Sequence, residues 1–464
     1  MFPSAADLVA QFLKANDYAE TLQAFIREAG LAPGAGGASG SDITIEQILQ
    51  EKKTFDLSVN FEKLGVEDND RQWRVPSPSK PLMLESIPTK SNILSVSLVN
   101  CKLPYMSETK TYVATTTADR RLHLFDPHAP SLPLAHSYAS FLDSPILDLV
   151  VLQNRYLFIG SMSGRLLLFD TEADEVLDQR RDHTKYIVKL ATWADGPSTI
   201  LASAGWDSKI FLYRFGLEDE NLQLGEPIAA INLSSIPEAL LFIKSPDTPR
   251  PIMLLTRKDS TVLYYYSVPL PGETQINLLA RQNLAPHSNA WISFTPSDIQ
   301  LSPQDPSLIA VATSSTPHMK LIVARLLIPP PEVVTGVNSS PGSGPVTQAA
   351  QSRANLLVED REEAAITINI STMAPQTTYS TPRLAWRPDG SGIWVNSDDG
   401  IVRGFEATTG KQIAALEGHE NGLKVRCLWA GQVKRPSADS THTPNGDEFL
   451  VTGGFDQKLL IWNT

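Results

Sequence analysis

The hydrophobic pattern of the first thirty residues predicts two short helices. Apolar side chains recur at helical spacing on both sides of Asn16-Asp17: Leu8, Val9, Phe12 and Leu13 before it, and Tyr18, Leu22 and Phe25 after it. Asn and Asp interrupt helices because their side chains compete for backbone hydrogen bonds. We therefore expect a helical hairpin from about residue 4 to residue 28, with Ser4 as a candidate cap, inside a first unit of residues 1–31.

A connector is expected to follow over residues 32–80. Its glycine-rich start, residues 32–40, is typical of a flexible linker. Ile45, Ile48 and Leu49 then indicate a short helix after a capping Ser or Asp. The stretch 66–81 is polar and contains proline, so we expect it to form a second connector.

From about residue 81 to residue 464 the pattern changes to short strands that repeat. Each copy has a few apolar or small residues, a turn, and an apolar run that often ends in an aromatic side chain. The turns fall at Asp119, Ser163, Asp207, Asp259, about 317, Asp399 and Asp456. Seven copies predict a mainly β unit of seven repeating sheets. The longest interval contains residues 329–363, which we expect to form a solvated loop inserted between two sheets.

The last copy carries the clearest motif. Gly418-His419 precedes its first strand, and Thr452, Asp456 and Trp462-Asn463 follow. This pattern resembles the WD-repeat β-propeller over about residues 81–464. The resemblance implies a buried hydrogen-bonded set in each well-matched blade, listed here for the last blade and then the third: His419, Thr452, Asp456 and Trp462; His183, Ser203 and Asp207, with Tyr213 in place of tryptophan.

Closure of the ring needs one more strand. The last copy stops after its third strand, and an open sheet edge invites aggregation. The segment Lys80–Ser86, directly before the first copy, is the natural candidate for the missing fourth strand.

The N-terminal hairpin resembles the LisH motif. The match rests on Leu8, Phe12, Leu13, Asp17-Tyr18, Thr21, Phe25 and Glu28. Asp17 stands where the family usually has glycine, and Leu22 where it has a small residue. The resemblance implies homodimerisation through the apolar residues Leu8, Phe12, Leu13, Tyr18, Leu22 and Phe25. LisH followed by a WD-repeat propeller is the architecture of scaffold families in ubiquitin ligases, transcription-regulatory complexes and similar assemblies, so it also implies a non-catalytic scaffold.

Composition narrows the classes of partner. The 464-residue chain has a net charge of −12, which argues against general binding to nucleic acid or to an anionic membrane as its function. No apolar run has the roughly 18 residues of a membrane helix. The start of the chain lacks the basic region of a secretory signal, so we expect a cytoplasmic or nuclear protein. Cys101 and Cys427 are the only cysteines, which excludes a disulfide framework.

The sequence offers no convincing catalytic group. Residues 404–412 resemble a phosphate-binding loop, but five residues separate the glycines and Gln412 follows the lysine, so a turn is expected. His183 and His419 could be mistaken for bases opposite Asp207 and Asp456, but structural hydrogen bonds account for them. We expect no cofactor or metal. The alternative is a propeller hydrolase with a site in the central channel, which would need acids, histidines or metal ligands to converge there.

The residue before each turn is the best candidate for binding. In WD-repeat propellers this position tends to face the central opening. It is apolar in blades seven, one, two and three, as Phe455, Ala118, Met162 and Trp206, and Tyr186 belongs to the same sector. Lys258 and Asp398 occupy it in blades four and six. Exposed aromatic side chains are typical anchors for a protein or peptide partner. The alternative is that some of them pack under neighbouring loops.

Overall fold

The computed structural model describes residues 5–35, 44–45, 73, 75–84, 87–129, 132–139, 143–195, 198–216, 222–245, 248, 250–286, 294–330, 348–433 and 447–463. The chain forms two compact units, Met1–Asp68 and Asn69–Thr464. Each unit is described by itself below.

The first unit contains the predicted helical hairpin. Helix α1 spans Ala5–Ala15 and helix α2 spans Ala19–Glu28. Asp17 adopts a left-handed backbone conformation with φ of 57°, and the Asn16 side chain donates to the Phe12 carbonyl at 3.0 Å. The chain therefore turns where the sequence predicts. Ser4 and the expected helical segment beyond Ile45 lie outside the described residues.

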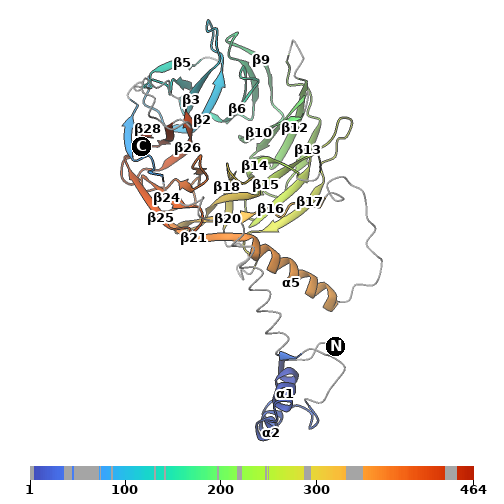
Figure 1. Ribbon diagram of the computed structural model, residues 1–464. Helices are drawn as coiled ribbons and strands as arrows, with labels where there is room; N and C mark the ends of the chain where they lie inside the picture. Colours follow the sequence, from blue (N-terminus) through green and yellow to red (C-terminus); the bar gives the residue numbers. More distant parts are fainter. Residues whose placement is uncertain are drawn as a thin grey trace. The chain divides into compact units, whose positions relative to one another are not determined.

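The second unit is a seven-bladed β-propeller of four-stranded antiparallel sheets, which confirms the predicted fold (Figure 1). Blade one consists of β2 (Ile93–Cys101), β3 (Lys110–Thr117), β4 (Leu122–Phe125) and β5 (Leu134–Tyr138). Blade two consists of β6 (Ile146–Leu152), β7 (Tyr156–Ser161), β8 (Leu166–Asp170) and β9 (Glu175–Arg180). Blade three consists of β10 (Ile187–Asp195), β11 (Ser198–Gly205), β12 (Lys209–Gly216) and β13 (Ala229–Asn232). Blade four consists of β14 (Pro237–Lys244), β15 (Pro251–Arg257), β16 (Val262–Ser267) and β17 (Leu278–Asn283).

The remaining blades include one departure from simple strand order, in blade seven. Blade five consists of β18 (Thr295–Leu301), β19 (Leu308–Ser314), β20 (His318–Arg325) and β21 (Ile366–Pro375). Blade six consists of β22 (Leu384–Trp386), β23 (Gly392–Val395), β24 (Ile401–Glu406) and β25 (Gln412–Glu417). Blade seven consists of β26 (Val425–Val433), β27 (Asp447–Gly454), β28 (Leu459–Asn463) and β1 (Lys80–Met83).

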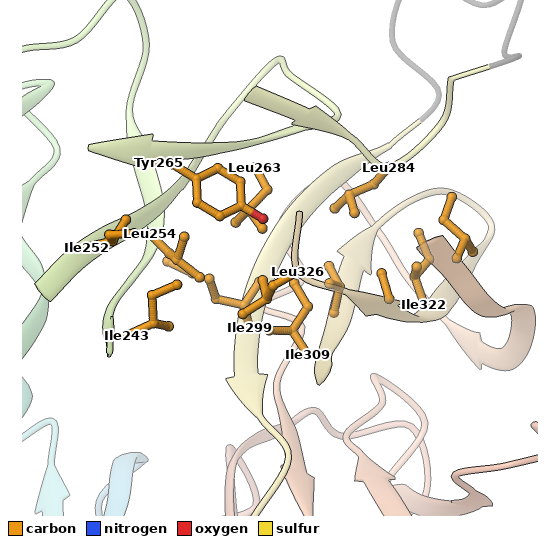
Figure 2. Packing of buried hydrophobic residues seen from close by; sticks show 14 of the residues in the cluster. Ile243, Ile252, Leu254, Leu263, Tyr265, Leu284, Ile299, Ile309, Ile322 and Leu326 are labelled. Atoms are coloured by element: carbon orange, nitrogen blue, oxygen red, sulfur yellow. The ribbon is translucent and has the colours of Figure 1, made fainter. Parts of the chain in front are cut away.

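The core of the propeller lies between neighbouring blades. Because each sheet is covered on both faces, its middle strands are almost continuously apolar, as in β8, in which all five residues are buried. Figure 2 shows the cluster between blades four and five, where Leu254 and Tyr265 face Ile309. The first strands of adjacent blades contact one another all the way round the ring, so they line its centre.

The insertion after residue 325 differs from the prediction in place and content. Residues 329–363 were expected between two sheets, but they lie within blade five, between its third strand β20 and its fourth strand β21. The insertion also contains helix α5 (Gln348–Ala365). Glu362, expected on a solvated face, is buried and accepts the backbone N–H of Asn283 at 2.7 Å. Burial raises the pKa of Glu362, and the hydrogen bond compensates for part of that cost.

Blade seven is closed as predicted. Strand β1 pairs antiparallel with β28, with Lys80 opposite Asn463 and Met83 opposite Leu460. Packing against the propeller begins earlier than the expected boundary at residue 80, because Trp73 already packs into the core between blades six and seven. Its ring meets Trp394 edge-on with the centroids 5.2 Å apart. The linker is therefore shorter than the sequence indicates.

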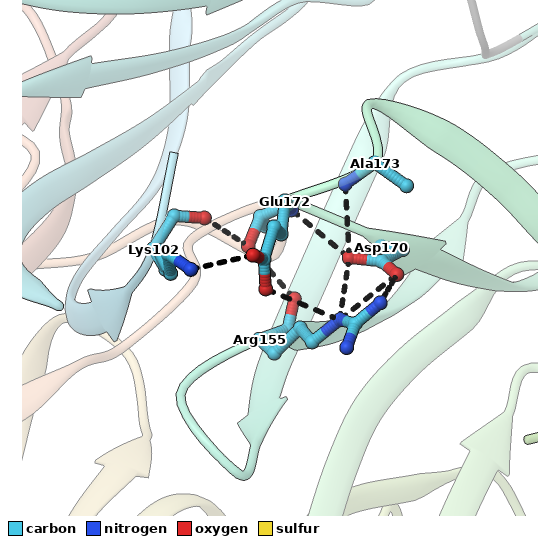
Figure 3. Close-up of polar contacts among 6 residues, drawn as sticks. Lys102, Arg155, Asp170, Glu172 and Ala173 are labelled. Atoms are coloured by element: carbon cyan, nitrogen blue, oxygen red, sulfur yellow. Dashed lines mark hydrogen bonds and ion pairs between the residues drawn. The ribbon is translucent and has the colours of Figure 1, made fainter. Parts of the chain in front are cut away.

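A polar network joins blades one and two (Figure 3). It lies on the face of the ring opposite to the turns that follow the second strands. Lys102 of blade one pairs with Glu172, and its carbonyl accepts the Thr171 hydroxyl at 2.7 Å. Arg155 forms a bidentate pair with Asp170, at 2.6 Å for the shorter contact of Nη2 with Oδ2. Burial of Asp170 raises its pKa, but Arg155 and the backbone N–H groups of Glu172 and Ala173 together lower the pKa overall. The blades are thus held by charge-assisted bonds as well as by apolar packing.

Candidate protein-interaction face

The predicted hydrogen-bonded set is present in blade seven. His419 Nδ1 lies 2.8 Å from Asp456 Oδ2, and its Nε2 lies 2.8 Å from Thr452 Oγ1. Trp462 Nε1 donates to the same Thr452 oxygen at 2.9 Å. Burial of Asp456 raises its pKa, but the hydrogen bond and charge of His419, together with the backbone N–H groups of Glu420 and Lys458, lower the pKa overall. These side chains are fully engaged with one another, so they serve to hold the blade together.

Blade three has the same arrangement with one substitution. His183 bridges Asp207 and Ser203, at 2.9 Å to each. Tyr213, in the tryptophan position, donates its hydroxyl to Asp182 at 2.9 Å. Burial lowers the pKa of His183, which keeps the ring neutral at physiological pH. Asp207 also accepts the backbone N–H of Thr184 at 2.9 Å, so the set fastens the loop before the first strand to the turn after the second.

Those loops and turns form one face of the ring, which we call the turn face. In five blades the residue before the turn donates its backbone N–H to the loop that precedes the first strand, at 2.8–2.9 Å. The five donors are Ala118, Met162, Trp206, Lys258 and Phe455. Equivalent backbone bonds place these residues at equivalent positions around the ring, as the sequence predicts.

The predicted aromatic residues are exposed on the turn face. Tyr186 and Trp206 stack on each other, with ring centroids 5.4 Å apart and planes 27° from parallel. They remain 37% and 46% exposed, and Phe455 is 39% exposed, so none of the three is covered by a neighbouring loop. Ala118 is exposed and Met162 is half-buried. The stack in blade three is thus the most developed apolar platform among the predicted residues.

Sequence reasoning missed two apolar residues on this face. Tyr379, in the loop before β22, is 86% exposed, and Leu423, in the loop before β26, is 37% exposed. Between them, Lys424 pairs with Asp398 at 2.8 Å. Only their position in the repeat could have indicated these two residues, since each lies in a loop that leads into the first strand of a blade.

The comparisons with known families follow the same division of the chain. Residues 71–463 match the UCP007778 beta-propeller domain, and residues 7–35 match the UCP007778 LisH domain. The chain belongs to the UCP007778 family. None of the curated proteins matches it. The family match confirms the LisH domain and the β-propeller, and it supports a fold used for protein interaction.

The LisH hairpin of this UCP007778 chain leaves its apolar residues incompletely covered. Leu8, Phe12 and Leu13 of α1 are half-buried, as are Leu22 and Phe25 of α2. Tyr18 is 53% exposed, and α2 contains no buried residue. The described part of the first unit therefore presents an apolar surface without a packing partner of its own.

Within the described part of the UCP007778 chain, no group of three or more His, Cys, Asp or Glu side chains is arranged to hold a metal ion. Cys101 and Cys427 are buried free thiols, and burial raises the pKa of each to about 12, so neither is a reactive thiolate. Residues 404–412 form parts of β24 and β25 and the turn between them, as predicted. No described helix is both long and apolar enough to span a membrane.

Proposed function

We propose that this protein is a non-catalytic scaffold or adaptor subunit. In this proposal the turn face of the propeller binds a protein or peptide partner, and the LisH hairpin pairs two chains. The assembly would be a multiprotein complex such as a ubiquitin ligase or a transcription-regulatory complex. The observation that carries the proposal is the exposed stack of Tyr186 on Trp206, because stacked aromatic side chains at a surface are typical of interface anchors.

Partner capture by single-residue variants tests the binding face. Trp206→Ala, Tyr186→Ala and Phe455→Ala in the full chain should reduce the partners recovered by affinity purification and mass spectrometry. Their melting temperatures should stay within about 2 °C of wild type, because exposed side chains contribute little to folding. Leu278→Ala is a matched control, since Leu278 is 40% exposed on the outer strand β17. Unchanged recovery with all three variants would overturn the proposed binding face.

Dimerisation rests on the uncovered hairpin. A helical unit below about 40 residues rarely buries enough surface alone, and association is one of the few remedies. The hairpin has neither cysteine nor histidine, so disulfides and a metal held by those residues are not available to it. Two hairpins packed together would cover Leu8, Phe12 and Phe25 in a four-helix arrangement.

Sedimentation equilibrium tests this arrangement. Wild type should be a dimer, and Phe12→Asp should be a monomer, because an unpaired carboxylate in the shared core is strongly unfavourable. Gln23→Asp is the matched control, since Gln23 is exposed on α2. A wild-type chain that stays monomeric at tens of micromolar, an order-of-magnitude choice for a moderately tight pair, would contradict the proposal.

A further inference from the structure

Irregularities in the innermost strands create a second ring of residues at the turn face. In six blades the first strand contains a β-bulge close to the turn face, where the register of its pairing with the second strand shifts by one residue. The residues in these bulges are Leu94, Leu147, Val188, Glu238, Ser297 and Arg426. The paired residue just before each of them is buried, whereas all but Ser297 are half-buried and reach solvent. Because these strands surround the centre of the ring, we call the central part of the turn face, where these residues reach solvent, the mouth.

The mouth has an apolar side and a charged side. In blades one to three the bulge residues are Leu94, Leu147 and Val188, whereas blade four has Glu238 and blade seven has Arg426. The outer ring changes at the same place, from Trp206 in blade three to Lys258 in blade four. Both sets of positions thus change from apolar to charged between blades three and four, whereas blade seven combines the apolar Phe455 with Arg426.

Positive charge on the charged side lacks close carboxylate partners, although Glu238 attracts Lys258 without a direct ion pair. Neither Arg426 nor the Lys258 amine has an ion pair or side-chain hydrogen bond with any described residue. Arg383, nearby, is held by Asp298 at 3.4 Å. Burial, helped by Arg383, lowers the pKa of Arg426 to about 10, so it remains charged at neutral pH. Burial raises the pKa of Glu238 to about 7, so this carboxyl carries only part of a negative charge there.

A guanidinium that is partly removed from water without a carboxylate is unfavourable, and an acidic ligand would remove that cost. We infer that the mouth binds an acidic peptide segment of a partner protein. Its carboxylates pair with Arg426 and Lys258, and an apolar side chain of the same segment packs on Val188 and Trp206. This inference rests on the proposed function and adds the chemical class of the partner.

Selection from an unbiased library of random short peptides, with the full chain as bait, tests the inference. The selected peptides should be net acidic and contain at least one large apolar residue. Synthetic copies in which Asn and Gln replace Asp and Glu should bind at least about ten-fold more weakly, because charge-assisted pairs are lost. Affinity for the acidic copies should also fall as salt is raised.

Two charge variants locate the site. Arg426→Gln should weaken the acidic peptides by about ten-fold, and its melting temperature should equal or exceed that of wild type because an unpaired, half-buried charge is removed. Lys411→Gln removes the same charge from the exposed turn after β24, on the opposite face, and should bind as wild type does. Basic or neutral selected peptides, or unchanged affinity in Arg426→Gln, would overturn the inference. If Trp206→Ala still abolishes binding in that case, the proposed function stands; if it changes nothing, both fail.

Discussion

Trp73 is the residue by which the segment before β1 holds the propeller, and Trp73→Ala tests that role. The ring lies against Gly392 and Gly404, where a Cβ atom would overlap it. Trp394 meets it edge-on, and the Arg387 guanidinium lies 4.6 Å from its centroid. Alanine would leave a hollow above the two glycines, because their backbone cannot collapse into it.

The magnitude follows from these contacts. A largely covered tryptophan removes about 150 Å² from water, worth ~4 kcal/mol at about 25 cal/mol per Å². The edge-on contact and the cation–π contact add about 1 kcal/mol, and compactness of the unfolded chain subtracts a similar amount. We therefore expect the free energy of unfolding to fall by about 3–4 kcal/mol. For a unit of about 390 residues this lowers the melting temperature by roughly 4–5 °C.

Urea unfolding of the full chain, followed by tryptophan fluorescence and by circular dichroism, measures the change. Val75→Ala is the matched control, since Val75 belongs to the same segment but is 56% exposed, and it should cost less than about 0.5 kcal/mol. Gly404→Ala should resemble Trp73→Ala, because the added methyl group displaces the same ring. A loss below about 1 kcal/mol in Trp73→Ala, at an unchanged denaturant slope, would refute the reasoning.

Three further predictions concern the ring. Removal of residues 1–68 should leave a soluble propeller. Removal of residues 1–90 also deletes β1 and exposes the edge of β28, so this fragment should aggregate. A monodisperse 91–464 fragment in size-exclusion chromatography would contradict this prediction. Glu238→Gln should raise the free energy of unfolding by about 2 kcal/mol above pH 7 and hardly change it below pH 4.5. The raised pKa of Glu238 means that the wild-type protein loses stability as the pH rises between those two values, whereas the amide does not titrate. Equal unfolding free energies of variant and wild type at pH 8 would argue against this prediction. Arg387→Met should cost about 3–5 kcal/mol in chemical unfolding, because it leaves Glu448 without its bidentate partner at 2.6 and 3.0 Å; the double variant with Glu448→Leu should recover part of the loss.

The sequence predicts best those features whose motif residues themselves make the structural contacts. His419, Thr452 and Asp456 identify the last blade because their own side chains make its hydrogen bonds. The turn positions and the closing strand follow from the same repeat. The position before the turn is predictable for the same reason, since a backbone hydrogen bond fixes it in five blades.

The features that sequence misses depend on partners far along the chain or on backbone irregularity. Trp73 stands in a polar stretch, and its backbone N–H bonds to Glu406 across 333 positions. The bulge residues Leu94 and Val188 look like ordinary strand residues, because a register shift has no residue type of its own. The sequence pattern places the insertion between two sheets because the insertion separates β21 from the other three strands of blade five.

Closure by β1 also has a consequence in time. The ribosome makes β1 about 380 residues before its partner β28. At a synthesis rate of about 5–20 residues per second, the residues that cover β1 and Trp73 are made roughly 20–80 s after them. The LisH hairpin is synthesised before that interval begins. In the proposed dimer, two nascent chains on one messenger could therefore join before either ring has closed, and assembly would then precede completion of the fold.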